Sequence, residues 1–424
     1  MHDARDKFRK LTAVFDPIYQ PRGDAGGGGP SDGSPPEAYV PGIHEGYRRQ
    51  LEAALDLNDS AKLLVAGQPG CGKTTMLLDL AAAMRRDGRV VAFVDLEAHT
   101  AVQDLDPVEM YLAALAETVE QAGPELLGTT LEACRRCLAK MLRTEVQAEP
   151  GSLVLGLRRL LSLVRNDGQL REEMRLTMKS GGDDDPFDLL SRALSDLAER
   201  RPVVILDGLD KLPPVRARQT FLDDKRKPMA EAPAAAILTI PLSVVYEPTF
   251  NVLSGRYNNA DAAVLPAVRL WHFDPGSRER TRSEDGIAAL HRVVSARVDP
   301  IDPEIVMPDA IDRAIIGSGG NIRELARLMQ AGVIKAHVRK GQFVETQDIE
   351  AAIADQRESF RRAYDPSFLP LLVRVRDEYR LDDSSDIAKQ LLYGLWVIEY
   401  RNGSAWYCLP EPVQQLVMHL ERSR

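Results

Sequence analysis

The sequence predicts a doubly wound α/β fold. Apolar runs that are too short for helices alternate with longer segments of helical period. Because strands that alternate with helices build parallel sheets covered by helices, we expect one parallel sheet at the core. The run at 203–206, bounded by Pro202 and by Asp207-Gly208, is typical of a strand buried on both faces. The other expected strands are 62–66, 89–96, 234–242 and 267–271.

Size and composition limit the class of protein. The chain has 424 residues, of which 44% are hydrophobic and 28% are charged, so we expect two or three domains with ordinary cores. No apolar stretch is long enough to cross a bilayer, and the charged residues 1–10 lack the apolar region of a secretory signal. We therefore predict a cytoplasmic protein that does not enter a membrane. The net charge of −9 gives no general attraction to nucleic acid, but it allows a local basic surface.

The four cysteines are too few and too scattered for a disulfide framework in a chain of this length. Cys134 and Cys137 form one CxxC pair inside a helical pattern, with no second pair or histidine nearby. The ligand count therefore favours packing on a helix face over a zinc site.

Four regions are expected along the chain. Residues 1–38 are a flexible N-terminal segment and linker: 23–36 are rich in glycine and proline and cannot bury enough apolar surface to fold, whereas the apolar residues of 11–19 could pack on the main domain or on a partner. Residues 39–275 are the α/β core with a helical insertion, 276–360 a helical subdomain, and 361–424 a small separate domain. Helices are expected at 47–57, 76–84 and 308–354, and Asp185-Pro186 should open a helix that runs to about residue 200.

A glycine-rich loop follows the first expected strand. Its sequence, Gly67-Gln68-Pro69-Gly70-Cys71-Gly72-Lys73-Thr74, fits G-x-x-x-x-G-K-[ST], and an apolar helix comes next, with Thr75 a weaker member of the site. In such a P-loop the glycines let backbone N–H groups converge on phosphate oxygens at the positive end of a helix. We therefore predict a site for ATP with Mg²⁺. Lys73 should reach the β- and γ-phosphates, and the Thr74 hydroxyl should ligate the metal.

An acid ends the strand at 203–206. Asp207 is expected to hold the water shell of Mg²⁺, because a carboxylate at the tip of such a strand is well placed to do so. The general base that activates water would usually be a glutamate beside this aspartate, but Gly208 stands there. Asp210 is the substitute candidate, and a cap or surface acid is the alternative reading. ATP binding is thus better supported than ATP hydrolysis.

These motifs, together with Gly319-Gly320-Asn321-Ile322-Arg323-Glu324-Leu325, resemble the AAA+ and STAND ATPases, particularly the Orc/Cdc6-like branch. The resemblance covers about residues 39–354 and implies a P-loop NTPase core with a helical lid subdomain. It makes Arg323 a sensor 2 arginine that reaches the γ-phosphate. The residues themselves agree that Asn321 can cap a new helix, and they leave an exposed first-turn arginine as the plainer reading.

The same resemblance assigns further roles. The strand 236–240 would carry sensor 1, which makes Thr239 a candidate for orienting the attacking water. Arg256 is a candidate arginine finger, with an ordinary loop arginine as the alternative. The LDGLD sequence that ends at Asp210 favours slow, switch-like turnover of the STAND type.

The C-terminal residues suggest a winged-helix-like module. Residues 390–400 and 405–409 read as strands joined by a tight turn at Asn402-Gly403. The resemblance implies DNA binding, but residues 366–424 contain seven basic and eight acidic side chains, without a basic stripe. A protein-docking wing is the alternative. The aromatic side chains either pack the small core or lie in an interface; they are Trp396, Tyr400, Trp406 and Tyr407.

The sequence as a whole thus predicts a nucleotide-dependent switch or assembly factor that hydrolyses ATP slowly. We expect it to self-associate with ATP and to act on a protein partner, with DNA as a possible partner. A DNA-binding ATPase or loader, and a nucleotide-stabilised scaffold with negligible turnover, are the alternatives. A metabolic P-loop kinase is disfavoured, because no acceptor pocket can be read and the motif at 319–325 would be unexplained.

Overall fold

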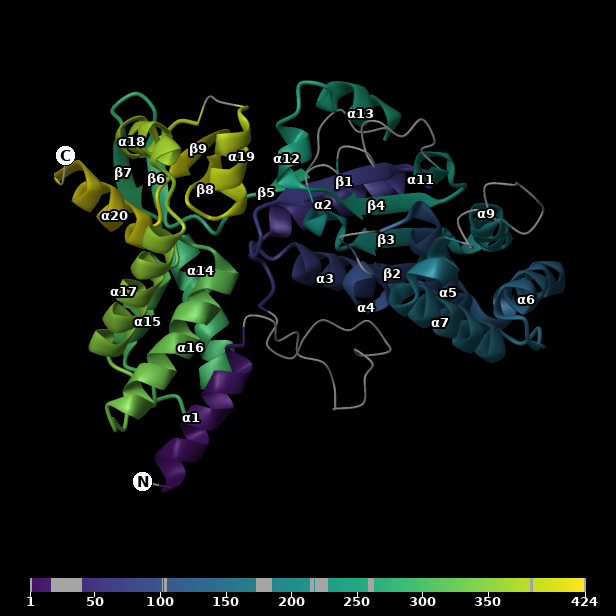
Figure 1. The fold of residues 1–424 in the computed structure, drawn as a ribbon, viewed down its shortest axis with the longest axis horizontal. Coiled ribbons are helices and arrows are strands. Elements are labelled where there is room, and N and C mark those ends of the chain that lie inside the picture. The colour runs from purple at the N-terminus through teal and green to yellow at the C-terminus, as the bar shows by residue number, and fades with distance from the viewer. Residues whose placement is uncertain are drawn as a thin grey trace. The chain divides into compact units, whose positions relative to one another are not determined.

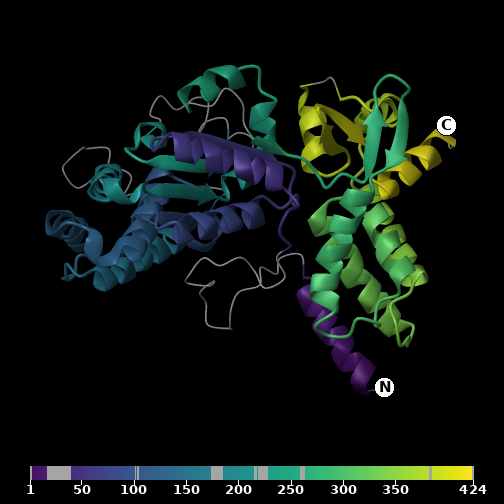
Figure 2. The same cartoon turned by 180° about the vertical axis from the view of Figure 1, so that it is seen from behind.

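The computed structural model describes residues 2–16, 40–100, 102, 105–172, 185–213, 217, 228–257, 263–381 and 384–422 (Figures 1 and 2). The chain forms two compact units. One consists of Met1–Glu45, Gly67–Thr75 and Leu265–Arg424, and the other of Gly46–Ala66 and Met76–Val264. The boundaries differ from the expected linear division, because the P-loop is grouped with the C-terminal half of the chain.

The second unit is built on a five-stranded sheet with the order β2-β3-β4-β1-β5. Parallel pairing joins β1 (Lys62–Gly67) to β4 (Ala235–Thr239), β4 to β3 (Val203–Asp207), and β3 to β2 (Val91–Asp95). The predicted α/β fold is therefore confirmed. The expected strand at 267–271 is wrong: β5 covers Ala263–Leu265, and the next backbone N–H groups leave the sheet, with Ala267 N donating to Glu399 O at 3.1 Å.

Helices cover this sheet, and α5 (Pro107–Ala122) is buried on nearly all sides, packing on β2, α7 and α9 (Figure 1). Asp185 caps α9 as predicted, because its side chain accepts a hydrogen bond from Phe187 N at 2.8 Å. Cys134 and Cys137 are both buried in α6, as expected for cysteines that pack on a helix face. The remaining helices are α2 (Glu45–Leu57), α3 (Lys73–Arg86), α4 (Leu96–His99), α6 (Gly128–Leu142), α7 (Pro150–Asn166), α9 (Pro186–Asp196), α11 (Pro228–Glu231), α12 (Leu242–Val245) and α13 (Phe250–Arg256).

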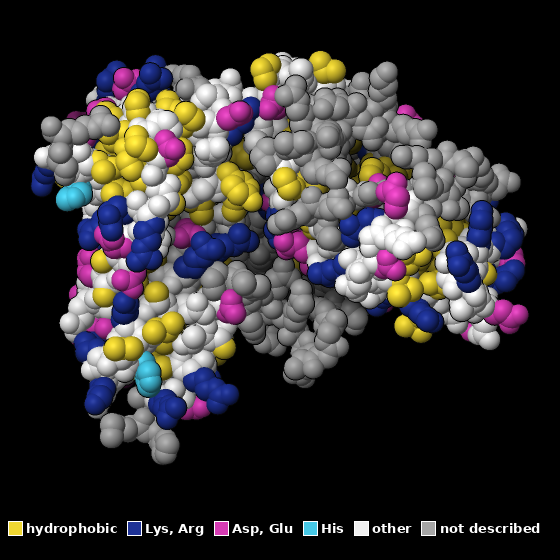
Figure 3. All heavy atoms as spheres, viewed as in Figure 1, with side chains coloured by type: hydrophobic (Ala, Val, Ile, Leu, Met, Phe, Trp, Pro, Cys, Tyr) yellow, Lys and Arg dark blue, Asp and Glu magenta, His cyan; other side chains and the backbone are white. Residues whose placement is uncertain are grey.

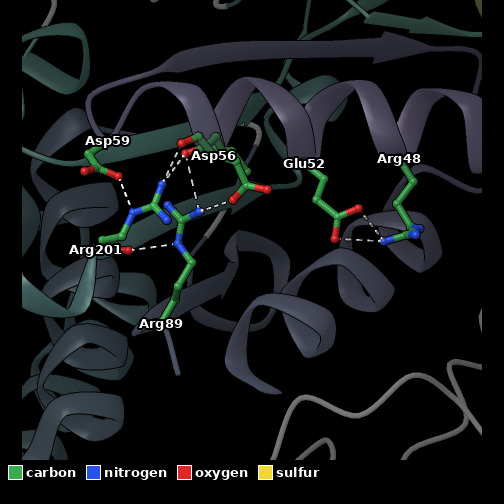
Figure 4. Close-up of polar contacts among 7 residues, drawn as sticks. Arg48, Glu52, Asp56, Asp59, Arg89 and Arg201 are labelled. Atoms are coloured by element: carbon green, nitrogen blue, oxygen red, sulfur yellow. Dashed lines mark hydrogen bonds and ion pairs between the residues drawn. The ribbon is translucent and has the colours of Figure 1, made fainter. Parts of the chain in front are cut away.

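Two arginines hold the C-terminal end of α2 (Figure 4). Arg201 donates to Leu55 O at 3.2 Å and to Asp56 O at 2.9 Å, and it pairs with Asp59 at 2.5 Å. Arg89 donates to Arg201 O at 3.1 Å, and desolvation lowers the pKa of its guanidinium. Cations at the last carbonyls of a helix satisfy acceptors that the helix cannot pair itself. These arginines tie α2 to the segments that precede β2 and β3.

In the first unit, helices pack around one apolar core. They are α14 (Glu284–Val298), α15 (Pro308–Gly317), α16 (Ile322–Val338) and α17 (Thr346–Arg362). The N-terminal helix α1 (His2–Val14) packs on α16 (Figures 1 and 2), with Phe8, Leu11 and Phe15 at most 3% exposed. Of the two alternatives for the apolar residues before the linker, the described ones thus pack on the rest of the chain. The glycine-rich part, 23–36, lies outside the described residues.

The C-terminal module belongs to the same unit. It contains α18 (Leu369–Glu378), α19 (Asp386–Tyr393), β8 (Ile398–Asn402), β9 (Ser404–Cys408) and α20 (Glu411–Arg422). The predicted hairpin at Asn402-Gly403 is confirmed. The strand expected from residue 390 is wrong in its first part. Ser385 caps α19 by accepting from Ala388 N at 3.2 Å, and the helix continues to Tyr393 because Leu391 and Leu392 are buried.

The aromatic side chains of the module form a core. Trp396, Tyr400, Trp406 and Tyr407 are each at most 8% exposed, so core packing is confirmed for all four. A second hairpin, β6 (Trp271–Asp274) and β7 (Glu279–Arg282), packs against them: the rings of Phe273 and Trp406 stack with centroids 5.3 Å apart. The core therefore joins the hairpin to the module.

Candidate nucleotide-binding site

The P-loop lies between β1 and α3, as its motif requires. Gly70 has a φ of +82°, in the left-handed region that favours glycine. A Cβ at this position would also lie 2.4 Å from Arg323 Cβ. Glycine is thus needed at position 70 both for the turn and for the close approach of α16.

Lys73 points back along the loop. Its Nζ donates to Gly67 O at 3.0 Å and to Gln68 O at 3.2 Å, and the residue is only 5% exposed. Thr74 and Thr75 follow it in the first turn of α3 and are partly exposed. The ammonium is therefore held beside the loop whose backbone N–H groups are the predicted phosphate ligands.

His44 also supports the loop, and sequence reasoning missed it. Its Nε2 lies 2.7 Å from Cys71 O, and the side chain is buried. Burial lowers the pKa of this imidazole, and the positive charge of Lys73 lowers it further. A neutral ring that donates its Nε2–H to the carbonyl fits this environment. No motif connects a histidine 27 residues away with Cys71, so no sequence signal could have found the contact.

The N-terminal end of α16 meets the loop within the first unit. The Asn321 side chain caps the helix as predicted, accepting from Arg323 N and Glu324 N at 3.1 Å each. The same side chain donates through Nδ2 to Pro69 O at 2.8 Å, and Arg323 N also reaches Gly70 O at 3.3 Å. Among the described residues, the Arg323 guanidinium makes no hydrogen bond or ion pair. A half-exposed cation without a partner therefore stands at the edge of the phosphate-binding loop.

The other predicted residues lie at strand ends in the second unit. Asp207 is the last residue of β3, is 5% exposed and pairs in register with Asp95 of β2. Thr239 ends β4, and its hydroxyl accepts from Gly208 N at 3.0 Å and donates to Leu206 O at 3.3 Å. The hydroxyl thus fixes the turn after Asp207. Because its single proton is used by Leu206 O, Thr239 can meet a water in this arrangement only as an acceptor.

The missing glutamate has a backbone explanation. Gly208 has a φ of +101°, a conformation that a glutamate would adopt only with strain. Asp210 follows in the short helix η4 (Leu209–Lys211) and is half-exposed. Sequence reasoning missed a second carboxylate: a Cβ on Gly208 would lie 3.8 Å from Glu97 Cγ, and Glu97 forms an ion pair with Lys211. Arg256 ends α13, and its side chain lies outside the described residues.

The oxygen donors suit a hard cation. A threonine hydroxyl and an aspartate carboxylate, at Thr74 and Asp207, are the ligand types that Mg²⁺ takes beside phosphate oxygens and water. Within the described ranges, no group of three or more His, Cys, Asp or Glu side chains forms a protein-only metal cage. Each of the two donors is thus of a kind that suits Mg²⁺ bound together with a nucleotide.

A glycine-bent loop between a parallel strand and a helix, with an acid at the tip of another strand of that sheet, defines a P-loop NTPase. Residues 50–222 match the family model of the KAP family P-loop domain, a segment that contains both the loop and Asp207. The chain therefore carries a P-loop NTPase domain. No curated protein matches the chain at a significant level.

Solved structures similar to this chain include Orc and Cdc6 proteins. The Aeropyrum pernix ORC2 protein, in its ADPNP-ADP complexes, is 12% identical with a TM-score of 0.45, and 97% of each chain is covered. Cdc6p from Pyrobaculum aerophilum is 12% identical with a TM-score of 0.41, also over 97% of each chain. The Aeropyrum pernix ORC1 protein in complex with DNA is 13% identical, with a TM-score of 0.38 over 91% of this chain and 95% of that one.

No helix within the described parts of the chain is both long enough and apolar enough to span a membrane.

Proposed function

We propose that this protein is an ATP-binding switch or assembly factor in which the bound nucleotide controls self-association and action on a protein partner, with slow ATP hydrolysis. ATP binds with Mg²⁺ on the loop 67–75, Lys73 meets the β- and γ-phosphates, and Thr74 and Asp207 hold the metal side. Arg323 senses the γ-phosphate. A ligand shifts a conformational equilibrium only through contacts that differ between states, and an arginine that meets only the triphosphate supplies such a contact.

The observation that carries this proposal is the placement of Arg323. Its backbone N–H is bonded to Gly70 O, whereas its guanidinium has no partner among the described residues. A cation held at a phosphate-binding loop without a carboxylate is poised for an anionic ligand. A plain surface arginine would not need the close approach to Gly70 that excludes a side chain there.

Nucleotide titration of single variants tests the proposal. Lys73→Ala should abolish ATP binding. Arg323→Ala should weaken binding of a slowly hydrolysed ATP analogue while leaving ADP binding unchanged, because only the triphosphate carries the γ-phosphate. Arg327→Ala is the matched control, since that arginine lies one turn further along α16 and pairs with Glu324 at 2.6 Å. Normal ATP binding by Lys73→Ala would overturn the site, and equal loss of ADP and analogue in Arg323→Ala would overturn the sensor role.

A scaffold with negligible turnover is the second candidate, and Gly208 favours it. The positive φ at this position disfavours the glutamate that usually activates water. Asp210 would then be the substitute base in the switch and a surface acid in the scaffold. Single-turnover hydrolysis separates the two, because a scaffold retains bound ATP indefinitely.

A protein partner is favoured over DNA by the charges of the C-terminal module. Three of its basic side chains lie near carboxylates of the module: Arg376 with Asp377 at 2.7 Å, Arg401 with Glu399 at 3.6 Å, and Lys389 with Asp386 at 3.8 Å. Figure 3 shows apolar side chains gathered over the upper-left part of the face in view, with basic and acidic side chains around them. Affinity for phosphate backbones comes from unneutralised Lys and Arg, so this surface supports DNA binding weakly.

A further inference from the structure

One P-loop side chain is buried and points into the C-terminal module. Gln68 is 1% exposed, and its amide makes three hydrogen bonds there. Nε2 donates to Leu392 O at 2.8 Å and to Val397 O at 2.7 Å, and Oε1 accepts from Glu399 N at 2.8 Å. Both amide hydrogens and the oxygen are thus used, all on backbone atoms of a module more than 300 residues later in the chain.

The amide acts on β8 as a neighbouring strand would. Val397 O and Glu399 N point to the same side of the chain, which is the pattern that a paired strand contacts. Leu392 O lies in the last turn of α19, where it also accepts from Leu395 N at 3.3 Å. Gln68 therefore satisfies backbone groups of two elements of the module, α19 and the start of β8. Glu399 O is held in turn by Ala267 N at 3.1 Å.

The backbone of the same residue belongs to the phosphate site. Gln68 O accepts from Lys73 Nζ at 3.2 Å and from Cys71 N at 3.3 Å. The carbonyls of the loop, from Gly67 to Cys71, all accept hydrogen bonds, which holds the loop in shape for its other N–H groups to converge on phosphate. Two of these bonds come from α16, and one comes from His44. Gln68 adds a side-chain link from the loop to the C-terminal module.

From this we infer that Gln68 is a positioning residue that couples the P-loop to the C-terminal module. The docked module holds the loop in the conformation that fixes Lys73, and nucleotide binding in turn stabilises the docking of the module. The coupling is reciprocal by thermodynamic necessity, so whatever loosens the module also weakens nucleotide binding. This inference rests on the proposed nucleotide site. Gln68 is the contact through which that site is coupled to the module.

The test combines nucleotide affinity with hydrogen exchange of the full-length chain. Gln68→Ala should weaken binding of a slowly hydrolysed ATP analogue about 5- to 150-fold, the range of typical allosteric couplings. In the unaltered protein the analogue should slow exchange of the amides at 391–400, and in Gln68→Ala this protection should disappear even at saturating analogue. A merely structural role would lower stability without removing a nucleotide-dependent protection.

Two further variants sharpen the test. Gln68→Glu keeps the shape and the acceptor for Glu399 N but loses both donors, so it should behave like Gln68→Ala. Gln390→Ala is the matched control, an exposed glutamine on α19, and should leave affinity and protection unchanged. Wild-type affinity and wild-type protection in both Gln68 variants would overturn the inference and leave the proposed function intact. Failure of the unaltered protein to bind the analogue would overturn the proposed function itself.

Discussion

His44 makes the phosphate-binding loop sensitive to acid. Its pKa in the folded protein lies below the ordinary value of 6.5, so the unfolded chain binds more protons between these two values. Folding stability should therefore fall as the pH decreases from about 6.5 through the lowered pKa, and the loss is complete below it. The cause is that a protonated ring would be buried beside Lys73.

Chemical denaturation of the nucleotide-free protein across this pH range checks the effect. In His44→Gln, which can still donate to a carbonyl but does not titrate, the dependence should be smaller. His419→Gln is the control, because that histidine is exposed. An unchanged pH slope in His44→Gln would rule out His44 as its source.

Two carboxylates, those of Asp210 and Glu97, are candidates for the general base in the proposed hydrolysis of ATP. Asp210→Asn should lower the rate of ATP hydrolysis about 10²- to 10⁴-fold, the usual contribution of a general base, and leave ATP affinity unchanged. Glu97→Gln is the comparison, because Glu97 lies beside Gly208 but is held by Lys211. Loss of turnover in Glu97→Gln alone would transfer the role to Glu97.

At the scale of elements, α1 is a stabilising part of the helical subdomain. Leu11 is fully buried in the core that α1 shares with α16, so Leu11→Ala should lower the free energy of unfolding by about 2 to 5 kcal/mol. Lys10→Ala is the control, since Lys10 is exposed and pairs with Asp6 on the same helix. Urea denaturation measures both. A cost below about 1 kcal/mol for Leu11→Ala would mean that α1 is dispensable.

The C-terminal end of α2 should be equally sensitive. Arg201→Ala removes donors to Leu55 O and Asp56 O, and because these bonds carry a charge we expect a cost of about 1.5 to 3 kcal/mol. Arg48→Ala should cost about 1 kcal/mol or less, because Arg48 pairs with Glu52 one turn along the same helix (Figure 4) and with Asp79 at 3.5 Å, and ion pairs of this kind contribute less than charged bonds to helix carbonyls. Equal effects of the two variants on thermal unfolding would contradict this view of α2.

Local sequence signals predicted the elements whose conformation is determined by neighbouring residues. The strand at 203–206, the Asp185 cap and the turn at Asn402-Gly403 each depend on neighbouring residues. Where distant segments decide, local signals were not sufficient: α1 packs on α16, and residues 267–268 bond to Glu399 and Gly320 instead of pairing with a strand of the five-stranded sheet. The P-loop was readable from its motif, but the contacts of His44 and Gln68 were not, because both bridge long sequence separations.

At the scale of the whole molecule, the nucleotide should control assembly. We expect the light-scattering mass to be larger with a slowly hydrolysed ATP analogue than with ADP, because in the proposed switch only the triphosphate would contact Arg323. Arg323→Ala should stay at the smaller mass. A further increase with a DNA duplex would favour the DNA-loading alternative over a protein partner. A monomer under every condition would contradict the assembling switch.

The contact between Gln68 and β8 also protects the module from unwanted association. β8 is paired with β9 on one side, and on the other side Gln68 and Ala267 occupy its backbone groups. A strand edge without such cover is a template for pairing with another chain. If the module separated from the loop, the backbone groups of Val397–Glu399 would become a short unpaired strand edge. The P-loop would then also control when a strand of another chain can pair with this edge.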